Sequence, residues 1–433
     1  MTNGVKLNSA KPMETIQTGL AWQMRKNPMG ETHKDALRLG FDHEVKREFH
    51  GTEVTSGIYV EQHQGLEAFS KIGGEWDDLF RRSDGASPFL ARAWAITFVR
   101  EGRLQGTPLL ITVRADQKLV ALLALSVHRA AGTKIAEPIS TTVPSYLGVL
   151  LDPQFRRAIY WMADFIAKKS SIGVLSFQNV SSADQATNEL IGELGKRRFI
   201  SHSTKRRTCH YIRLGCSFDE YLKTSKSAKQ RKKLRKEDRK LSKYGQVKLL
   251  RYEAAEISPE ILSRVAAIQE QSWMKRRGGS VLGQPFYQKL LLEMAEADLG
   301  RVWLMTIDGE DAAFKYALIS HRRLYLQWTA FKLKYASSLS VGKVLTQATI
   351  RDACDNGIVS IDFGHGDAPH KRFWATDSYD VNRVAVGRGL AGRLVVLWLA
   401  VRWWLANRKW IRTRYQACRR QFQKVRNQFA SAD

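Results

Sequence analysis

Apolar residues follow helix and strand periodicities in two separate parts of the chain. In the first part, apolar residues three and four positions apart indicate helices, and short apolar runs between turn residues indicate strands. The predicted helices are Leu66–Arg82, Pro88–Glu101 and Tyr160–Lys169, and the predicted strands are Leu109–Val113, Leu119–His128 and Gly173–Phe177. This part of the chain therefore predicts a domain of mixed helices and strands.

A similar order of elements recurs in the second part. Its predicted strands are Val302–Ile307, Ala312–Ser320, Leu324–Phe331 and Ile358–Phe363, and its predicted helix is Val341–Asn356, with the stop signal Gly357. The segment Val113–Leu125 has the same order of strand, turn and strand as Thr306–Leu318. We interpret this as a weak internal repeat, which predicts two lobes with mixed sheets rather than a solenoid.

The pattern divides the chain into four ranges. Residues 1–57 are polar and lack sustained periodicity, so we predict a disordered N-terminal tail. We predict an N-terminal lobe over 58–215, a C-terminal lobe over 216–390 that carries a basic helix over 223–243, and a basic amphipathic C-terminal helix over 391–433. The predicted fold class is α/β, with mixed α+β character.

Positive charge is concentrated in two segments. The 433 residues contain 69 Lys and Arg against 42 Asp and Glu, a formal net charge of +27. Lys223–Lys243 carries +9 of this charge and Arg383–Arg426 carries +12, since the second segment has no acidic residue. The remainder of the chain is nearly neutral, which excludes a uniformly polycationic protein.

Cysteine usage and the lengths of the apolar runs predict a cytoplasmic protein. Four scattered cysteines are too few for a disulfide framework, which favours a reducing compartment. The N-terminus has no apolar run typical of a signal peptide, and the longest apolar stretch, Leu394–Leu405, is interrupted by Arg402. That stretch is too short to span a bilayer, so we expect a soluble protein or one peripheral to the inner face of a membrane.

Two sets of residues resemble known binding motifs but lack the neighbouring elements or spacings that those motifs need. Gly387, Gly389 and Gly392 fit G-x-G-x-x-G, but the returning strand and the later acidic residue of a dinucleotide site are absent from the sequence. Glycines that ease the turn into the last helix explain the pattern better. The histidines and cysteines between positions 202 and 216 lack the spacings of metal ligands, and we predict structural roles for them and no metal.

An ordered set of short motifs carries a family resemblance. The set comprises Ala312–Phe331, Ser337–Gly342, Asp355–Gly357, Ile361–Asp367 and His370–Trp374, preceded by Trp76, Pro88–Phe89, Trp94, the basic helix Ser227–Tyr244 and Trp273. This order resembles the acetyltransferase-like domain of bacterial CelD/BcsL proteins, a branch of the GNAT superfamily related to FemAB-type peptidyltransferases. The resemblance covers about residues 65–390. His370 stands where the family usually has Tyr, and Lys315 interrupts an otherwise apolar strand.

The resemblance implies that acyl-CoA is bound as a co-substrate, with no permanently bound cofactor. GNAT enzymes hold its pyrophosphate on backbone N–H groups at the start of a helix that follows a splayed strand, where the helix dipole favours an anion. The matching residues here are Ser340, Val341, Gly342 and Lys343. An ordinary helix start with Ser340 as its N-cap is the alternative interpretation.

The loop after strand Ile358–Phe363 is the second candidate site. Acyl transfer needs a base and a group that stabilises the oxyanion, and ligands gather at the carboxyl ends of strands in open α/β sheets. We assign Asp367 or His365 as the base, and the FemAB-type resemblance implies that Lys371 stabilises the charge on the acyl carbonyl. We assign His370, Trp374 and Trp273 to substrate binding. A structural salt-bridge cluster of Asp362, Asp367, Lys371 and Arg372 is the alternative.

The two basic segments each have two interpretations. The helix Lys223–Lys243 either binds phosphates of tRNA or of a nucleotide-activated substrate, or is a solvated helix face with a buried leucine seam. The segment 391–426, rich in Trp and Arg, either lies at a membrane surface or packs on the second lobe.

These observations predict an acyltransferase that moves an acetyl or other acyl group from CoA to an amine or hydroxyl of a small-molecule or saccharide acceptor. The resemblance implies a link to exopolysaccharide or cell-envelope biosynthesis. Two alternatives stay open at this point: a FemAB-like transferase that uses aminoacyl-tRNA, and a non-catalytic accessory protein of a polysaccharide synthase.

Overall fold

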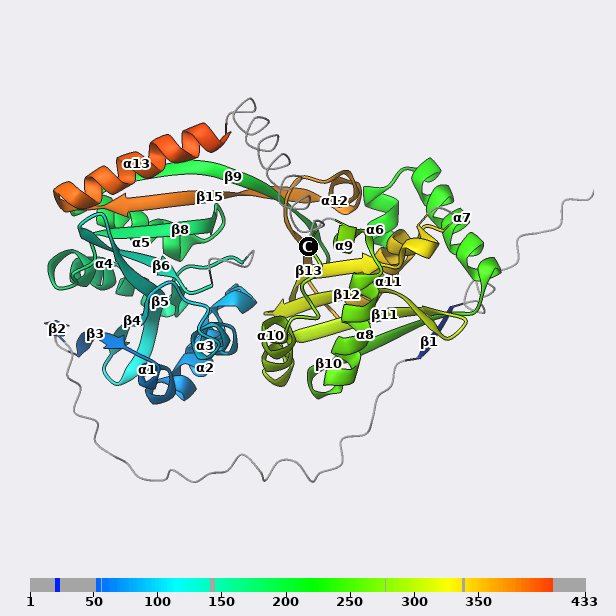
Figure 1. The fold of residues 1–433 in the computed structure, drawn as a ribbon, viewed down its shortest axis with the longest axis horizontal. Coiled ribbons are helices and arrows are strands. Elements are labelled where there is room, and N and C mark those ends of the chain that lie inside the picture. The colour runs from blue at the N-terminus through cyan, green and yellow to red at the C-terminus, as the bar shows by residue number, and fades with distance from the viewer. Residues whose placement is uncertain are drawn as a thin grey trace, which may run out of the picture. The chain divides into compact units, whose positions relative to one another are not determined.

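The computed structural model describes residues 20–23, 52–55, 57–140, 145–276, 278–336 and 339–407 (Figure 1). Most of the predicted N-terminal tail, and the predicted C-terminal helix beyond residue 407, lie outside these residues. The chain divides into two compact units. Unit 1 comprises residues 1–47, 210–364 and 368–377, and unit 2 comprises residues 48–209, 365–367 and 378–433. The chain thus enters each unit more than once, whereas the sequence pattern predicted contiguous ranges.

Unit 1 is built around a mixed sheet. Its strands are β1 (Leu20–Gln23), β10 (Val247–Glu253), β11 (Gly300–Ile307), β12 (Glu310–Ser320), β13 (Arg323–Phe331) and β14 (Ser360–His365), and they lie in that order across the sheet. Strands β10 to β13 are antiparallel neighbours, whereas β1 pairs with β10, and β13 with β14, in parallel.

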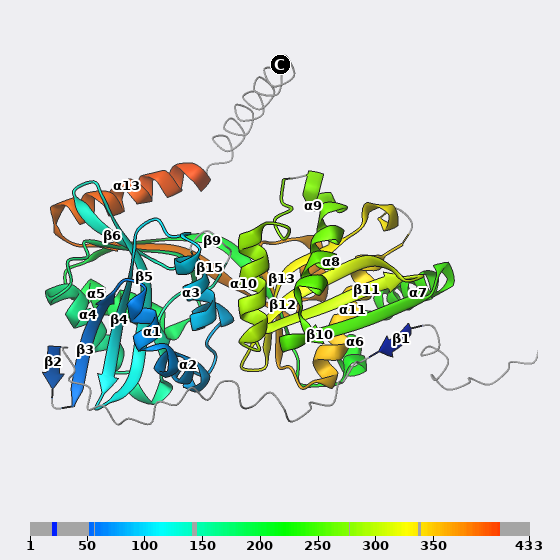
Figure 2. The same ribbon diagram turned by 60° about the horizontal axis from the view of Figure 1, so that its bottom comes forward.

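Helices cover both faces of this sheet (Figures 1 and 2). They are α6 (Phe218–Ser225), α7 (Ala228–Tyr244), α8 (Pro259–Glu270), α9 (Trp273–Arg276), α10 (Pro285–Glu296), α11 (Val341–Asp355) and α12 (Pro369–Trp374), with short 3-10 turns at Ala254–Glu256 and Leu333–Tyr335. On one face, Trp303 of β11 donates to Asp352 of α11. On the other face, the Tyr316 hydroxyl of β12 donates to the Leu291 carbonyl of α10. The alternation of side chains along the strands thus supplies two separate packing faces.

Unit 2 is also built on parallel and antiparallel strands. Its strands are β2 (Thr52–Thr55), β3 (Ile58–Gln64), β4 (Thr107–Ala115), β5 (Lys118–Ala130), β6 (Thr133–Pro138), β7 (Leu150–Leu151), β8 (Val174–Ser181), and most of β9 (Ile200–Arg213) and β15 (Asp377–Gly387). The order β15-β8-β6-β5-β4-β3-β2 runs across it, and β7 pairs with β5. The pair β6 and β8 is parallel and the pair β8 and β15 is antiparallel.

The helices of unit 2 also pack on two faces. They are α1 (Glu67–Lys71), α2 (Gly73–Arg82), α3 (Arg92–Arg100), α4 (Ala158–Lys168), α5 (Gln185–Lys196) and α13 (Gly389–Asn407), with 3-10 turns at Pro88–Leu90 and Pro153–Phe155. Leu175 and Phe177 of β8 join the core beneath α4 and α5. Val174 of the same strand instead packs with Val396 and Trp403 of α13. The mixed strand arrangement and the helices that pack on it confirm the predicted mixed α/β fold class.

The G-x-G-x-x-G segment allows α13 to approach the sheet closely. A Cβ at Gly392 would lie 2.5 Å from the Gly173 carbonyl oxygen, and one at Gly387 would lie 2.6 Å from the Gly392 carbonyl oxygen. Gly389 has a φ of +64°, which a glycine adopts readily. The motif therefore serves a turn and a tight helix contact, as the sequence analysis favoured.

The predicted basic helix over 223–243 is wrong as a single element. Helix α6 ends at Ser225 and α7 begins after Ser227, because Ser227 and Gln230 form a reciprocal capping box that starts a new helix. Leu234 and Leu241 of α7 are buried, which confirms the leucine seam for these two residues. The basic residues of α7 that are exposed are Lys229, Lys232, Lys233, Arg235, Lys236, Arg239, Lys240 and Lys243.

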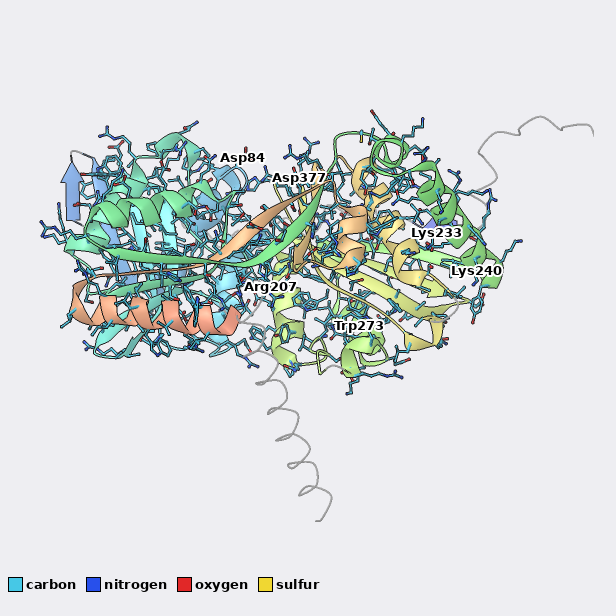
Figure 3. All side chains as sticks on the ribbon, turned by 90° about the horizontal axis from the view of Figure 1, so that it is seen from above. Asp84, Arg207, Lys233, Lys240, Trp273 and Asp377 are labelled. Atoms are coloured by element: carbon cyan, nitrogen blue, oxygen red, sulfur yellow. The ribbon has the colours of Figure 1, made fainter. Side chains whose placement is uncertain are left out.

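We expect Leu241→Ala to lower the free energy of unfolding by about 2–5 kcal/mol, because it leaves a cavity under α7. Lys240→Ala is the matched control, since this neighbouring side chain is exposed and points away from α7 in Figure 3. Urea denaturation followed by circular dichroism measures both variants. Equal stability of the two would show that α7 is not held by its leucine seam.

Candidate functional site

Strands β13 and β14 pair over a short ladder and then lead to the candidate site. The parallel register joins Arg323–Tyr325 to Ser360–Asp362 and covers only these three residue pairs. Beyond it, β13 continues to Phe331 and toward α11, whereas β14 continues into the glycine-containing loop before α12. Both candidate segments therefore begin at the carboxyl ends of neighbouring parallel strands, where ligands commonly bind.

Gly364 organises the start of the loop. Its φ of +67° is a left-handed conformation, and its N–H donates to the Asp362 carboxylate at 2.6 Å. The Lys371 ammonium donates to the Gly364 carbonyl oxygen at 3.1 Å. A Cβ at Gly364 would lie 3.2 Å from the Leu326 carbonyl oxygen, so a side chain would crowd β13. Glycine is therefore required here both for conformation and for space.

Lys315 of β12 places a second cation in the same unit. Its side chain is buried, at 5% exposed, and its ammonium is 3.5 Å from the Thr329 hydroxyl. Within the described part of the chain, no carboxylate lies within ion-pairing distance of it. Burial, and next the positive charge of Lys371, lower the pKa of Lys315 to about 8. A buried cation without a counter-charge is costly, which marks Lys315 as a functional candidate.

His370 is affected by the same two lysines. Partial burial of its ring, and then the charges of Lys371 and Lys315, lower the pKa of His370 below its usual value. The structure thus brings together two predicted site residues, His370 and Lys371, with a third group, Lys315, that we did not assign to the site. The sequence signal for Lys315 was its position inside an apolar strand.

A further buried lysine holds the predicted substrate-binding residue Trp374. The Lys226 ammonium lies 5.2 Å from the ring centre of Tyr221, 5.4 Å from that of Phe373 and 5.9 Å from that of Trp374. Burial lowers the pKa of Lys226 to about 8. Trp374 is itself only 2% exposed. These cation–π contacts fix α12 against the junction between α6 and α7.

The predicted base residues are grouped with the other unit. His365 and Asp367 belong to unit 2, whereas His370 and Lys371 belong to unit 1. The His365 ring packs edge-on against Tyr146, with ring centres 5.0 Å apart, and the Gly366 N–H donates to the Thr208 carbonyl oxygen. Asp367 is exposed. Trp273, the remaining predicted substrate-binding residue, starts α9 and is 38% exposed (Figure 3).

The start of α11 differs from the predicted capped helix. Ser340 is at the N-cap position, but its side chain makes no capping hydrogen bond. Its ψ of 45° departs from the extended conformation that turns an N-cap oxygen toward the helix amides. Among the described residues, nothing accepts a hydrogen bond from the N–H groups of Val341 or Gly342. These two amides are therefore suited to an external anion.

Gly342 and Lys343 contact neighbouring elements. A Cβ at Gly342 would lie 3.3 Å from the Phe331 ring, so the glycine fits against the end of β13. The Lys343 ammonium forms an ion pair with Glu237 of α7 at 2.8 Å. The positive charge of Lys343 is thus partly offset by a carboxylate, and the backbone amides are the stronger candidates for binding an anion.

Comparisons with known proteins find a match for one segment of the chain and similar folds among solved structures. Residues 228–372, which span α7 to α12, match the family model of the acetyltransferase (GNAT) domain. The crystal structure of FemX superposes with a TM-score of 0.54 at 12% identity, covering 75% of this chain and 96% of FemX. The C-terminal domain of a putative lysylphosphatidylglycerol synthetase from Agrobacterium fabrum gives a TM-score of 0.49 at 14% identity, covering 76% of this chain and 95% of that domain. A search of curated proteins found no match.

Residues 228–372, about a third of the chain, thus match a GNAT-type acetyltransferase domain, and this match together with the fold supports an acyltransferase enzyme. Domains of this class generally take acetyl-CoA as a co-substrate. The likeness to FemX, at 12% identity, concerns the fold. The kinship with the CelD/BcsL branch stays a prediction.

We expect the stability of the protein to depend on the protonation of Lys315. The folded-state pKa of about 8 lies below the ordinary value of 10.5, so the unfolded chain binds the proton more tightly. The charged Lys315 therefore lowers the free energy of unfolding by its full amount below pH 8. This destabilising effect disappears as the pH rises through 10.5. Relative to Lys315→Met, the wild type should gain at most about 3 kcal/mol between these pH values.

Urea unfolding of both proteins at pH 7, 8, 9 and 10 measures this difference. Lys240→Met, at an exposed position of α7, is the control and should show no such pH dependence. A constant difference between wild type and Lys315→Met would mean that Lys315 keeps an ordinary pKa.

Proposed function

We propose that unit 1 transfers an acyl group from acyl-CoA to an amine or hydroxyl acceptor, and that Lys371 and Lys315 stabilise the charge that develops on the acyl carbonyl oxygen. The observation that carries the proposal is the buried, uncompensated ammonium of Lys315, whose pKa is lowered in part by Lys371. A buried cation of this kind, with a second cation acting on it, favours an anion that forms during the reaction.

The chemistry requires three contributions. The nitrogen or oxygen of the acceptor attacks the thioester carbonyl, the tetrahedral oxyanion receives support from the two lysines, and the CoA thiolate leaves. Burial keeps water away from the Lys315 ammonium, which strengthens its interaction with an oxyanion. The base that accepts the proton is predicted to be Asp367 or His365. The residues that bind the acceptor are predicted to be His370, Trp374 and Trp273.

For the CoA moiety we propose the start of α11. The N–H groups of Val341 and Gly342 would hold pyrophosphate oxygens, aided by the helix dipole. Gly342 supports this proposal because a side chain there would crowd the Phe331 ring and cover the helix end. Only the CelD/BcsL resemblance supports a saccharide as the acceptor. The same resemblance is the only support for a place in cell-envelope or exopolysaccharide biosynthesis.

We expect Gly342→Glu to weaken acetyl-CoA binding roughly tenfold more than Gly342→Gln, because a carboxylate at the helix start repels phosphate and competes for the dipole. The two side chains are nearly the same size, so crowding of Phe331 is common to both and only the charge differs. Calorimetric titration of the full chain with acetyl-CoA measures the effect, and circular dichroism checks folding. Equal binding by the two variants would remove the start of α11 from the donor site.

A transferase that uses aminoacyl-tRNA is the second candidate. It is favoured by the eight exposed basic residues of α7, two of which, Lys233 and Lys240, are labelled in Figure 3, together with the FemX-like fold. If acetyl-CoA fails to bind, tRNA is the next ligand in the same calorimeter. Salt-sensitive binding that disappears when Lys232, Lys233 and Lys236 are replaced by Gln would then favour this candidate.

We propose peripheral attachment to an anionic membrane through α13, for which the sequence left two interpretations. Among the described residues, no helix combines the length and the apolar character needed to cross a bilayer. One stripe of α13 nevertheless exposes Leu390, Leu394, Leu397, Trp398, Val401, Trp404 and Leu405, each between 38% and 80% exposed. Arg393 and Arg402 are exposed at the two edges of this stripe. Large apolar side chains can insert into the membrane interface, and the flanking arginines attract acidic lipid headgroups.

We expect the full chain to float with phosphatidylglycerol vesicles at low salt and to lose this binding in Leu397→Asp and Trp404→Asp. Tyr160→Asp is the control, since Tyr160 is 53% exposed on α4, which covers the opposite face of the sheet. Unchanged flotation of the α13 variants would contradict the proposal. A dimer that these variants dissociate would assign the stripe to a second copy of the chain instead.

A further inference from the structure

A cluster of arginines lies on the β9 and β15 strands of unit 2. Arg206 and Arg207 are on β9, Arg383 is on β15 and Arg402 is on α13. Figure 3 labels Arg207, and Figure 1 labels the three elements. Strands β9 and β15 are neighbours in the sheet. The charges of Arg383 and Arg207 act on Arg206, and the charges of Arg207 and Arg402 act on Arg383. Arg206 and Arg383 are therefore each affected by further positive charges from these two strands or from α13.

The protein provides hydrogen-bond acceptors for only some of the N–H groups of these guanidinium groups. One terminal nitrogen of Arg206 donates to the Gln178 carbonyl oxygen at 3.0 Å and to the Asn179 side-chain oxygen, which fixes the direction of the group. The Nε atoms of Arg206 and Arg383 are buried and have no hydrogen-bond partner among the residues that the structure describes. A buried donor without an acceptor costs free energy, so an acceptor at this position would be stabilising.

The neighbouring acidic side chains are engaged elsewhere. Asp380 of β15 pairs with Lys205 at 2.8 Å and accepts from the Thr208 hydroxyl at 3.0 Å. Glu137 of β6 accepts from the Ser176 hydroxyl at 3.0 Å. Across the described ranges, no carboxylate forms an ion pair with Arg206, Arg207 or Arg383. Burial, followed by Arg383 and Arg207, lowers the pKa of Arg206 to about 10.

We propose that Arg206 and Arg383 form a binding site for the phosphate group of a ligand, with Arg207 and Arg402 at its margin. Several guanidinium groups with free N–H donors suit a tetrahedral oxyanion that carries more than one charge, whereas one carboxylate would neutralise only one of them. Arg402, whose guanidinium lies 5.2 Å from the Trp398 ring centre, connects the cluster to the apolar stripe of α13. The phosphate therefore comes either from a soluble ligand or from a lipid headgroup.

This site is independent of the proposed acyl transfer, since its arginines belong to unit 2 and the lysines of the transfer site belong to unit 1. Failure of one proposal leaves the other in place. Acetyl-CoA also carries phosphates, so the probes for the arginine site are inorganic pyrophosphate and phosphatidylglycerol vesicles.

The test uses the full chain and three variants. Calorimetric titration with pyrophosphate should show binding that weakens roughly tenfold or more in Arg383→Gln and in Arg206→Gln. Arg156→Gln is the control, because Arg156 is an exposed residue of the same unit that pairs with Glu189. It should bind pyrophosphate as the wild type does.

Melting temperatures, measured by thermal unfolding with and without pyrophosphate, show whether a variant that fails to bind is still folded. Removing one of the mutually repelling cations should leave Arg383→Gln at least as stable as the wild type without phosphate. Pyrophosphate should then raise the melting temperatures of the wild type and of Arg156→Gln more than that of Arg383→Gln. A lipid source is indicated if pyrophosphate has no effect but vesicle binding is weaker in Arg383→Gln than in Arg156→Gln. The proposal is overturned if Arg383→Gln matches Arg156→Gln with both probes, or if the wild type binds neither.

Discussion

The short parallel ladder between β13 and β14 is the constraint on which the candidate site of unit 1 depends. Because these strands pair over only three residues, each continues into its own segment, one toward α11 and the other toward α12. The amides at the start of α11 and the ammonium of Lys371 are thereby presented from neighbouring strands. A longer ladder would close the edge between them with main-chain hydrogen bonds and leave no place for an acyl donor.

Among the described residues, both units contain positive charge without a carboxylate partner. In unit 1 it is the buried Lys315, on which the charge of Lys371 acts, and in unit 2 it is the arginine cluster around Arg206 and Arg383. By contrast, Lys343 pairs with Glu237, Lys332 with Glu310 and Arg264 with Asp311. These other partly buried cations have carboxylate partners, and the buried Lys226 lies against three aromatic rings. Protein interiors tolerate such a charge where a ligand or a transition state supplies the missing anion.

The two basic segments that dominate the net charge differ in character. The charge of α7 covers the outside of a helix whose leucines are buried, so it is compatible with a solvated surface as well as with a polyanion. In α13 the arrangement is reversed, because large apolar side chains face outward and the close approach of Gly392 to β8 anchors the opposite side. Overall charge alone therefore says little about partners, whereas the side on which the apolar residues lie distinguishes the segments.

The sequence by itself determined the mixed α/β class and most element positions, because periodicity reports which residues must be buried locally. Strands such as β11 and β12, and the helix α11 with its glycine stop, lie within a few residues of their predicted bounds. Sequence analysis also selected the segment around Lys371. Only the tertiary structure decided that Lys315 lies within reach of the charge of Lys371, that the basic segment breaks at Lys226 and that the chain returns to unit 2 after residue 377. These features depend on which strands become neighbours, and local periodicity carries no information about contacts between residues far apart in the chain.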